Sequence, residues 1–275
     1  LVSSSAASDV YKRQAITILY LFRLANYGID FSDEGFYLNW ASYRYEYPTT
    51  TTYFGFLTGF IFDLLKEDIV NFRIFNICTS FILGLSAIFI SYRTSLNKNL
   101  SSIDFSSVLL LATISFLSFP FGFMTPSYNT LNFYGFCLIS ISLNFLKNKK
   151  DNHKLIFLTI YSIGFVLISL SKVTSVIPLI LFTFIFLLLQ RDLKLIFSLL
   201  VSNFIASLTA IYIFSGETPV DILQFVRRSI EFTQTLGSVH NADASLITRS
   251  ISQIVSIEKK QIIYFLFFTA INIIN

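Results

Sequence analysis

Residues 105–146 read FSSVLLLATISFLSFPFGFMTPSYNTLNFYGFCLISISLNFL, and no charged side chain occurs in these 42 positions. A membrane-spanning helix needs about 20 mostly apolar residues, so this stretch is long enough for two spans. Pro120, Gly122 and the segment Thr125–Ser127 predict a turn between them. The stretch therefore predicts a pair of membrane helices.

The composition of the whole chain favours the same class of protein. Hydrophobic residues make up 54% and charged residues 13% of the 275 positions, whereas a soluble domain carries about 25% charged residues. This excludes a soluble enzyme, a disordered tail and a disulfide-stapled secreted domain. A nucleic-acid-binding protein is also excluded, because the net charge of +4 comes from scattered loop residues. Cys78 and Cys137 lie in apolar stretches and imply no disulfide or metal framework.

We expect an all-α fold, namely a polytopic transmembrane helical bundle of about seven to eight spans with interfacial helices in its outward loops. Lys172 interrupts the apolar run from 155 to 190 and predicts a tight hairpin there. The expected spans cover about 15–29, 70–92, 105–121, 128–146, 155–171, 173–190 and 195–214, and a last one begins at 262.

The two ends of the sequence predict a fragment. Residues 1–14, LVSSSAASDVYKRQ, match no span pattern and resemble a translated sequencing adapter, so they are left out of the predicted fold. The chain stops at Asn275, inside an apolar run too short to cross a bilayer. We expect residues 15–275 to form one transmembrane domain that is clipped at both ends.

The distribution of Lys and Arg predicts the orientation. Eight of them fall in 25 positions in one set of loops, whereas seven fall in 81 positions in the other set. Basic residues concentrate in cytoplasmic loops, which puts the first set in the cytoplasm. That set is 93–104, 147–154 and 190–194, and the outward set is 30–53, 121–127, 171–173 and 215–261.

Two outward segments are expected to hold interfacial helices. TTYFGFLTGFIFDLL, residues 51–65, combines aromatic residues and glycines in a way that suits a helix lying in the interface or dipping back into it. PVDILQFVRRSIEF, residues 219–232, repeats apolar residues at helical spacing beside two arginines. An ordinary solvated loop helix is the alternative for the second segment.

The first outward loop carries the strongest candidate chemistry. Asp30, Asp33 and Glu34 place three carboxylates within five residues directly after a membrane helix. Adjacent carboxylates at a membrane edge should raise the pKa of at least one of them, unless a cation or a metal compensates. That is the setting of a general base. The alternative is a set of solvated acidic residues, and Arg23 in the first span is a candidate partner for this loop.

The order of features resembles the GT-C superfamily of membrane glycosyltransferases, nearest to the branch of the protein O-mannosyltransferases and the lipid A aminoarabinose transferase. The resemblance is a spaced pattern over about 30–190. It rests on an Asp-Glu pair followed by an aromatic residue, an apolar interfacial helix, a span that opens with Arg, and a lysine before a long apolar span. These are DEGFY (33–37), residues 51–65, DIVNFRIFNI (68–77) and LISLSKVTSVIPLILF (167–182).

The resemblance implies an inverting glycosyltransferase that uses a polyprenyl-phosphate sugar on the outer face. Asp33 matches the first-loop aspartate that acts as general base, and Glu34 is its neighbour. Lys172, Arg227 and Arg228 would provide cations for the phosphate, and Asp30 is grouped with these substrate-binding residues. Lys172 has the alternative role of a snorkelling lysine. The arginine pair has the alternative role of binding anionic lipid headgroups.

The chain departs from the family pattern at two places. Val173 and Thr174 stand where relatives carry Gly-Pro, and TPSYNTLN (125–132) lacks the acidic residue of some relatives. Tyr128 and Asn129 are the candidates there for binding a sugar hydroxyl or an acceptor, with helix capping as the alternative. The missing carboxylate leaves a divalent metal open, and no metal ligands are assigned.

The expected location is a bacterial inner membrane, with the active site facing outward. The expected partners are the lipid bilayer, the polyprenyl-phosphate sugar and a glycan, lipid or protein acceptor. Two other classes stay open. A lipid-linked glycan polymerase or ligase would depend on arginines in 215–261. A flippase or transporter usually shows mid-membrane charges or an internal repeat, and residues 15–275 show neither.

Overall fold

The described part of the chain is helical. The computed structural model describes residues 18–28, 33–46, 52–96, 124–147, 151–189, 193–218 and 220–222, with the single residues 12, 16, 224 and 227. These ranges contain no strand, which confirms the expected all-α class for this part of the chain. Residues 18–24 are helical. The later elements are α2 (Asp33–Ser42), α3 (Phe54–Leu64), α4 (Ile69–Leu96), α6 (Tyr128–Leu143), the 3₁₀ turn η1 (Asn144–Lys147), α7 (Asp151–Ser171), α8 (Val173–Leu189) and α9 (Leu193–Ser215).

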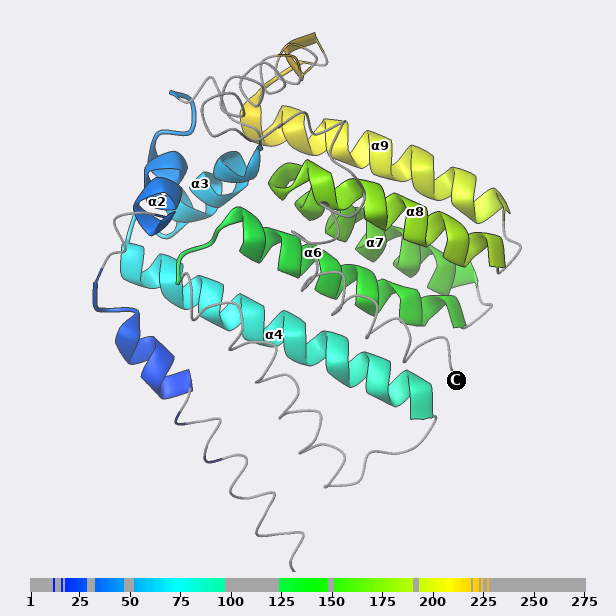
Figure 1. Ribbon diagram of the computed structural model, residues 1–275, viewed down its shortest axis with the longest axis horizontal. Coiled ribbons are helices and arrows are strands. Elements are labelled where there is room, and N and C mark those ends of the chain that lie inside the picture. Colours follow the sequence, from blue (N-terminus) through cyan, green and yellow to red (C-terminus); the bar gives the residue numbers. More distant parts are fainter. Residues whose placement is uncertain are drawn as a thin grey trace, which may run out of the picture.

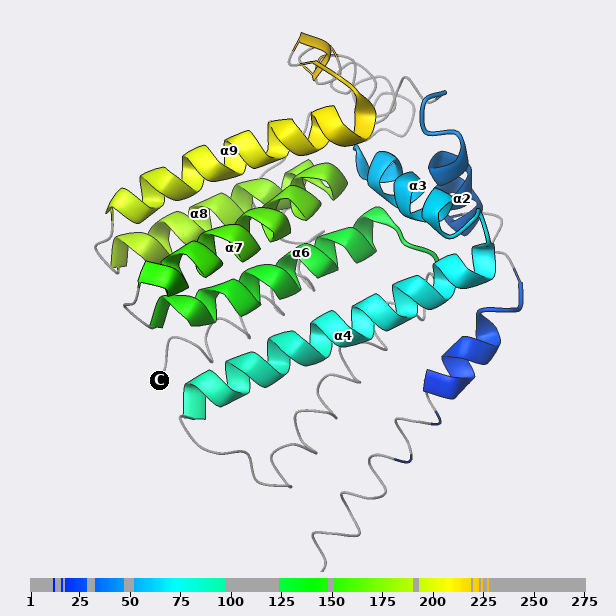
Figure 2. The same cartoon turned by 180° about the vertical axis from the view of Figure 1, so that it is seen from behind.

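Five long helices lie lengthwise against one another, and two short ones cover one end of them. Figures 1 and 2 show α4, α6, α7, α8 and α9 running along the same direction, with α2 and α3 at the end where α4 and α6 begin. Helix α7 is central, because it contacts α6, α8 and α9. The short helices pack on each other, and α3 also touches α9.

Three of the described helices are long and apolar enough to cross a membrane. They are Ile69–Thr94, His153–Ser171 and Lys194–Ser215, and they coincide with the spans expected at 70–92, 155–171 and 195–214. Helices α6 and α8 have 16 and 17 residues, which is below the length of about 20 that a perpendicular span needs. The spans expected at 105–121 and from 262 onward lie outside the described residues.

The first outward segment differs from its expected form as a loop. Ten of its residues form α2, and a helix, α3, is present within the segment 51–65 where one is predicted. Helix α2 begins with Asp33 and Glu34, whose charges favour a helix N-terminus. It also buries the Tyr37 and Trp40 side chains. Burial of these aromatic rings provides the driving force that a solvated loop would lack.

Local polar contacts fix the turns between helices. Ser127 caps α6, since its hydroxyl accepts from the Thr130 backbone N–H while the Ser127 N–H donates to the Thr130 hydroxyl. Asp68 accepts from the backbone N–H groups of Val70 and Asn71 and so caps α4. The one-residue hairpin predicted at Lys172 is present. Residues 124–127, the described part of the turn predicted before residue 128, are non-helical.

Helices α6 and α7 form the most extensive contact, and two glycines allow it. A Cβ on Gly135 would lie 2.6 Å from the Gly164 carbonyl oxygen and 2.4 Å from the Ile168 side chain. A Cβ on Gly164 would lie 2.7 Å from the Gly135 carbonyl oxygen. Small residues at such a crossing bring two backbones together, which is how membrane helices associate without a hydrophobic driving force.

The ends of the bundle separate the loops as the sequence predicts. One end holds α2, α3, the starts of α4 and α6, and Lys172, while the other holds the end of α4, η1, and the starts of α7 and α9 (Figure 1). The second end therefore carries Arg93, Lys147, Lys154 and Lys194. We call the first the α2–α3 end and the second the basic end.

Candidate active site

The acidic pair at the start of α2 divides into two different environments. Asp33 is exposed, whereas Glu34 is 5% exposed and points into the protein. Successive helical residues face directions about 100° apart, so one carboxylate can meet solvent while its neighbour is buried. Of this pair, only Asp33 is accessible to a substrate from outside the protein.

Arg73 in the first turns of α4 is the ion-pair partner of Glu34. Its Nε lies 2.9 Å from Glu34 Oε1, and its Nη2 lies 2.8 Å from Glu34 Oε2. The guanidinium also donates to the backbone carbonyls of Ala25, Tyr27 and Gly28. Arg73 is 3% exposed. This two-pronged pair joins three segments: the end of the first helix, the start of α2 and the start of α4.

This ion pair supplies a cation that compensates the negative charge of the buried Glu34 carboxylate. We expected Arg23 as a candidate partner of the acidic segment, whereas in the described residues the partner of Glu34 is Arg73. The sequence did single out Arg73 as the arginine that opens a span. It did not indicate that this arginine contacts Glu34, which lies 39 positions earlier.

An aromatic cluster lies beside the acidic pair. The Tyr37 ring is 5.7 Å from the rings of both Phe54 and Tyr128, and Trp40 is 4.7 Å from Phe54. Burial raises the pKa of Tyr37 above its ordinary value, and the nearby Tyr128 and Asp33 raise it further. Tyr37 is therefore neutral, and its ring packs against Tyr128 one helical turn after Asp33 on α2.

Lys172 belongs to the same group of side chains. Its Nζ lies 5.8 Å from the centre of the Tyr128 ring, a cation–π distance. Tyr37 on α2, Tyr128 on α6 and Lys172 between α7 and α8 thus form a series of contacts, and Asp33 lies one helical turn before Tyr37 on α2. The structure brings together an exposed carboxylate and a cation from segments that are about 140 residues apart, which sequence spacing alone does not show.

Of the four remaining candidate residues, two lie in the described part of the chain. Asn129 follows Tyr128 in the first turn of α6 and is half-buried. The start of α6 is capped by Ser127 and Thr130, which flank Tyr128 and Asn129. Arg227, which follows α9 in the chain, is helical and exposed. Asp30 and Arg228 lie outside the described residues.

A second polar link at the α2–α3 end was not indicated by the sequence. The Tyr53 hydroxyl donates to Glu217 Oε2 over 2.7 Å, which joins the start of α3 to the segment after α9. The Tyr53 backbone N–H donates to the Leu170 carbonyl of α7. These bonds hold the start of α3 against the ends of α7 and α9.

The described residues contain no group of three or more His, Cys, Asp or Glu side chains that could hold a metal ion. Comparisons with protein-family models, with curated proteins and with solved structures gave no match.

Proposed function

We propose that the chain is a membrane glycosyltransferase that moves a sugar from a polyprenyl-phosphate donor to an acceptor hydroxyl at the α2–α3 end. The observation that carries the proposal is the contact series from Tyr37 through Tyr128 to Lys172, with Asp33 one helical turn before Tyr37 on α2. A sugar transfer from a lipid phosphate needs a base on the acceptor side and a cation on the phosphate side. Asp33 on α2 and Lys172 at the far end of the contact series supply one group of each kind.

In the proposed reaction, Asp33 removes the proton from the acceptor hydroxyl while that oxygen bonds to the anomeric carbon. The bond from the anomeric carbon to the phosphate oxygen breaks, and its electron pair leaves with the polyprenyl phosphate. Lys172 stabilises the negative charge on the departing phosphate. The attack comes from the face opposite the leaving group, so the anomeric configuration inverts. The products are the glycoside, polyprenyl phosphate and a protonated Asp33.

Glu34 contributes through Arg73 in this proposal. The buried ion pair fixes the first turn of α2 against α4, and Asp33 is the residue before Glu34. A general base must be held within hydrogen-bond reach of the proton that it removes. Anchoring the adjacent residue restricts the position of Asp33 in the way that this step requires.

The proposal also includes the membrane arrangement. The basic end would face the cytoplasm and the α2–α3 end the outer side of a bacterial inner membrane, which agrees with the positive-inside rule. The bundle would contain about seven to eight spans, with α6 and α8 crossing together with the three longer helices. Accessibility of an introduced cysteine at Glu46 or Lys194 to an impermeant thiol reagent tests this orientation.

The decisive experiment replaces the proposed base in the full chain. Asp33→Asn should reduce transfer from a radiolabelled polyprenyl-phosphate sugar by about 10²-fold or more, the range lost with a general base. Expression and membrane insertion should be unchanged. Glu46→Gln, a change at an exposed carboxylate of the same end, is the control and should transfer normally. Normal transfer by Asp33→Asn would refute the assignment.

A further inference from the structure

The exposed side of α2 carries an aromatic ring beside the proposed base. Phe36 lies three residues after Asp33, so the two side chains are neighbours on the helix surface. Asp33 is exposed and Phe36 is 44% exposed. Tyr43 continues the last turn of α2, since its backbone N–H donates to the Asn39 carbonyl, and it is 54% exposed. Seven residues separate it from Phe36, which places both on the same side of the helix. We call Asp33, Phe36 and Tyr43 the outer face of α2.

Buried neighbours hold the Phe36 ring in place. Its centre lies 5.7 Å from the centre of the Tyr37 ring and 5.4 Å from that of Trp40, and both contacts are edge-to-face. Tyr37 and Trp40 are 2% and 3% exposed. A side chain that is already fixed loses little conformational freedom when a ligand packs on it. The exposed part of Phe36 is therefore a preformed aromatic surface beside Asp33. Figures 1 and 2 both show α2 at the margin of the α2–α3 end.

A sugar ring matches this combination of groups. The C–H bonds of a pyranose form apolar faces that pack against the negative face of an aromatic ring. The hydroxyls at its rim donate to a carboxylate, which only accepts hydrogen bonds. Phe36 and Asp33 offer one group of each kind at neighbouring positions. Tyr43 offers a second ring about 10 Å further along the helix, within reach of an oligosaccharide that begins at Asp33.

The outer face of α2 suits the other acceptor classes less well. Helix α2 contains the exposed carboxylate of Asp33 and no Lys or Arg, so a phosphorylated or otherwise anionic acceptor would be repelled. An extended polypeptide is often held through its backbone at the edge of a sheet, whereas the backbone groups of a helix bond to one another. Charge and hydrogen-bonding pattern therefore favour a neutral glycan.

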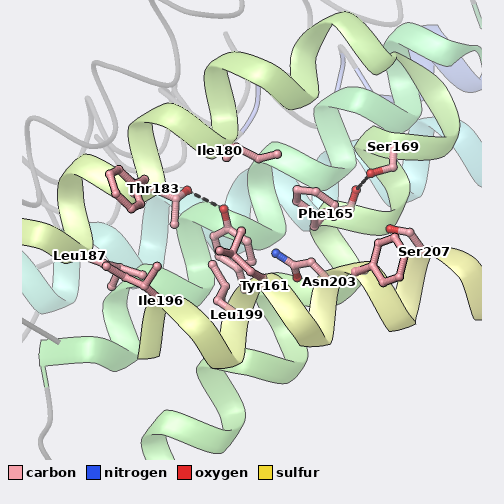
Figure 3. Close-up of a pocket in the computed structure, with 13 residues that line it drawn as sticks. Tyr161, Phe165, Ser169, Ile180, Thr183, Leu187, Ile196, Leu199, Asn203 and Ser207 are labelled. Atoms are coloured by element: carbon pink, nitrogen blue, oxygen red, sulfur yellow. Dashed lines mark hydrogen bonds between the residues drawn. The ribbon is translucent and has the colours of Figure 1, made fainter. Parts of the chain in front are cut away.

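The cavity between α7, α8 and α9 does not suit a hydrophilic acceptor. Figure 3 shows its wall, where the Tyr161 and Thr183 hydroxyls hydrogen-bond to each other and the Ser169 hydroxyl donates to the Phe165 carbonyl. Helices α7 and α9 are also long and apolar enough to cross a membrane. A sugar in this cavity would exchange its bonds to water for a mostly apolar wall, which is costly. The outer face of α2 involves no such exchange.

We infer that the outer face of α2 is the acceptor site and that the acceptor is a neutral glycan. This inference rests on the proposed function, since it takes Asp33 to be the general base. The terminal sugar packs on Phe36 and directs one hydroxyl to Asp33, which removes the proton of that hydroxyl during transfer. A sugar further along the glycan packs on Tyr43. Phe36 thus contributes to the choice of acceptor, while Asp33 performs the chemistry.

A glycan array tests the inference without requiring transfer. The labelled full chain, held in a detergent without a sugar headgroup, should bind neutral oligosaccharides in preference to acidic ones. Phe36→Leu keeps an apolar side chain against Trp40 but removes the ring, and should weaken binding about five- to tenfold. Phe36→Tyr keeps the ring and should bind normally. Phe60→Leu is the matched control and should also bind normally, because Phe60 is 47% exposed and packs edge-to-face on Phe214, but lies on α3.

Tryptophan fluorescence separates a glycan site from a surface that faces lipid. Trp40 is the only tryptophan in the sequence, so Phe36→Trp in a Trp40→Phe background reports the outer face of α2 alone. In reconstituted protein, an aqueous quencher should reduce this emission and brominated phospholipid should have little effect. Phe204→Trp in the same background is the lipid-exposed reference, because Phe204 is 65% exposed on α9. Equal quenching of both positions by brominated phospholipid would overturn the inference.

The array outcomes keep this inference distinct from the proposed function. The inference is overturned by preference for acidic glycans, by absence of glycan binding, or by equal loss in Phe36→Leu and Phe60→Leu. Neutral-glycan binding that depends on Phe36, in a protein without transfer activity, would leave the glycan site standing and refute the transferase alone. Transfer activity without glycan binding would refute the glycan site alone and point to a lipid or protein acceptor.

Discussion

The buried pair of Arg73 and Glu34 gives the sharpest stability prediction. Replacing Arg73 with Met keeps a long apolar stem but removes the guanidinium. The change deletes both bonds to Glu34 and those to the backbone carbonyls of Ala25, Tyr27 and Gly28. It also leaves a carboxylate of 7% exposure without its cation.

The expected loss of stability follows from that burial. Removing one partner of a buried ion pair costs about 3–5 kcal/mol, because the other charge stays buried. The protein supplies a matched control in Arg44, which pairs with Asp63 between α2 and α3 with side-chain exposures of 14% and 47%. A more exposed pair of this kind contributes about 0–1 kcal/mol. Arg73→Met should therefore cost several times more than Arg44→Met.

Thermal unfolding in detergent measures the difference. A fluorogenic thiol reagent reports unfolding through Cys137, which is 6% exposed in the folded protein. A loss of about 4 kcal/mol should lower the unfolding temperature by on the order of 10 °C, whereas Arg44→Met should shift it by about 3 °C or less.

The double variant tests the physical cause. Adding Glu34→Gln to Arg73→Met should restore part of the lost stability, because the buried charge without a cation is then removed. Equal shifts for Arg73→Met and Arg44→Met would show that the buried pair does not hold the three segments together. A double variant less stable than Arg73→Met alone would contradict the role assigned to the buried charge.

Three further predictions concern packing, pH and an interhelical hydrogen bond. Gly135→Ala should lower the free energy of unfolding by about 1–3 kcal/mol, because the added methyl group forces α6 and α7 apart. Gly84→Ala is the control in the same unfolding assay and should be tolerated, because its added Cβ would lie 3.6 Å from the Phe133 ring. Burial raises the pKa of Tyr37 above its ordinary 10.0, so its contribution to stability is complete below pH 10 and decreases as the pH rises beyond it. In a pH series, the unfolding temperature of Tyr37→Phe should therefore fall less between pH 9 and pH 11 than that of the unmodified protein. Tyr53→Phe removes the hydrogen bond to Glu217 and should cost about 1.5–3 kcal/mol, as for a bond to a charged group.

The sequence was most informative where charge interrupts an apolar run. Lys172 predicted the hairpin, which is confirmed. Of the turn predicted from Pro120, Gly122 and Thr125–Ser127, the described residues 124–127 are non-helical. The ends of the spans were harder to predict, because hydrophobic periodicity does not show where an α-helix changes into a 3₁₀ turn. The expected span at 128–146 ends its α-helical part at Leu143, and the next four residues form a 3₁₀ turn.

The candidate site could be predicted from the sequence only in part. Asp33 and Lys172 were selected for their chemical character, and their common location at one end followed from the order of spans. Their arrangement depends on the contact of Tyr37 with Tyr128, which are 91 positions apart. Pairing of Glu34 with Arg73 depends on how α2 lies against the start of α4. Such choices are set by tertiary packing and leave no local pattern in a single sequence.

Arg73 also sets an order of events during synthesis. Its guanidinium is made 39 residues after Glu34, yet it closes the end of the first helix and anchors the first turn of α2. Until the start of α4 has left the ribosome, the chain around residues 25–34 lacks the group that fastens it. A nascent chain that stops short of residue 73 therefore cannot hold Asp33 in its final position, however much of the acidic segment it already contains.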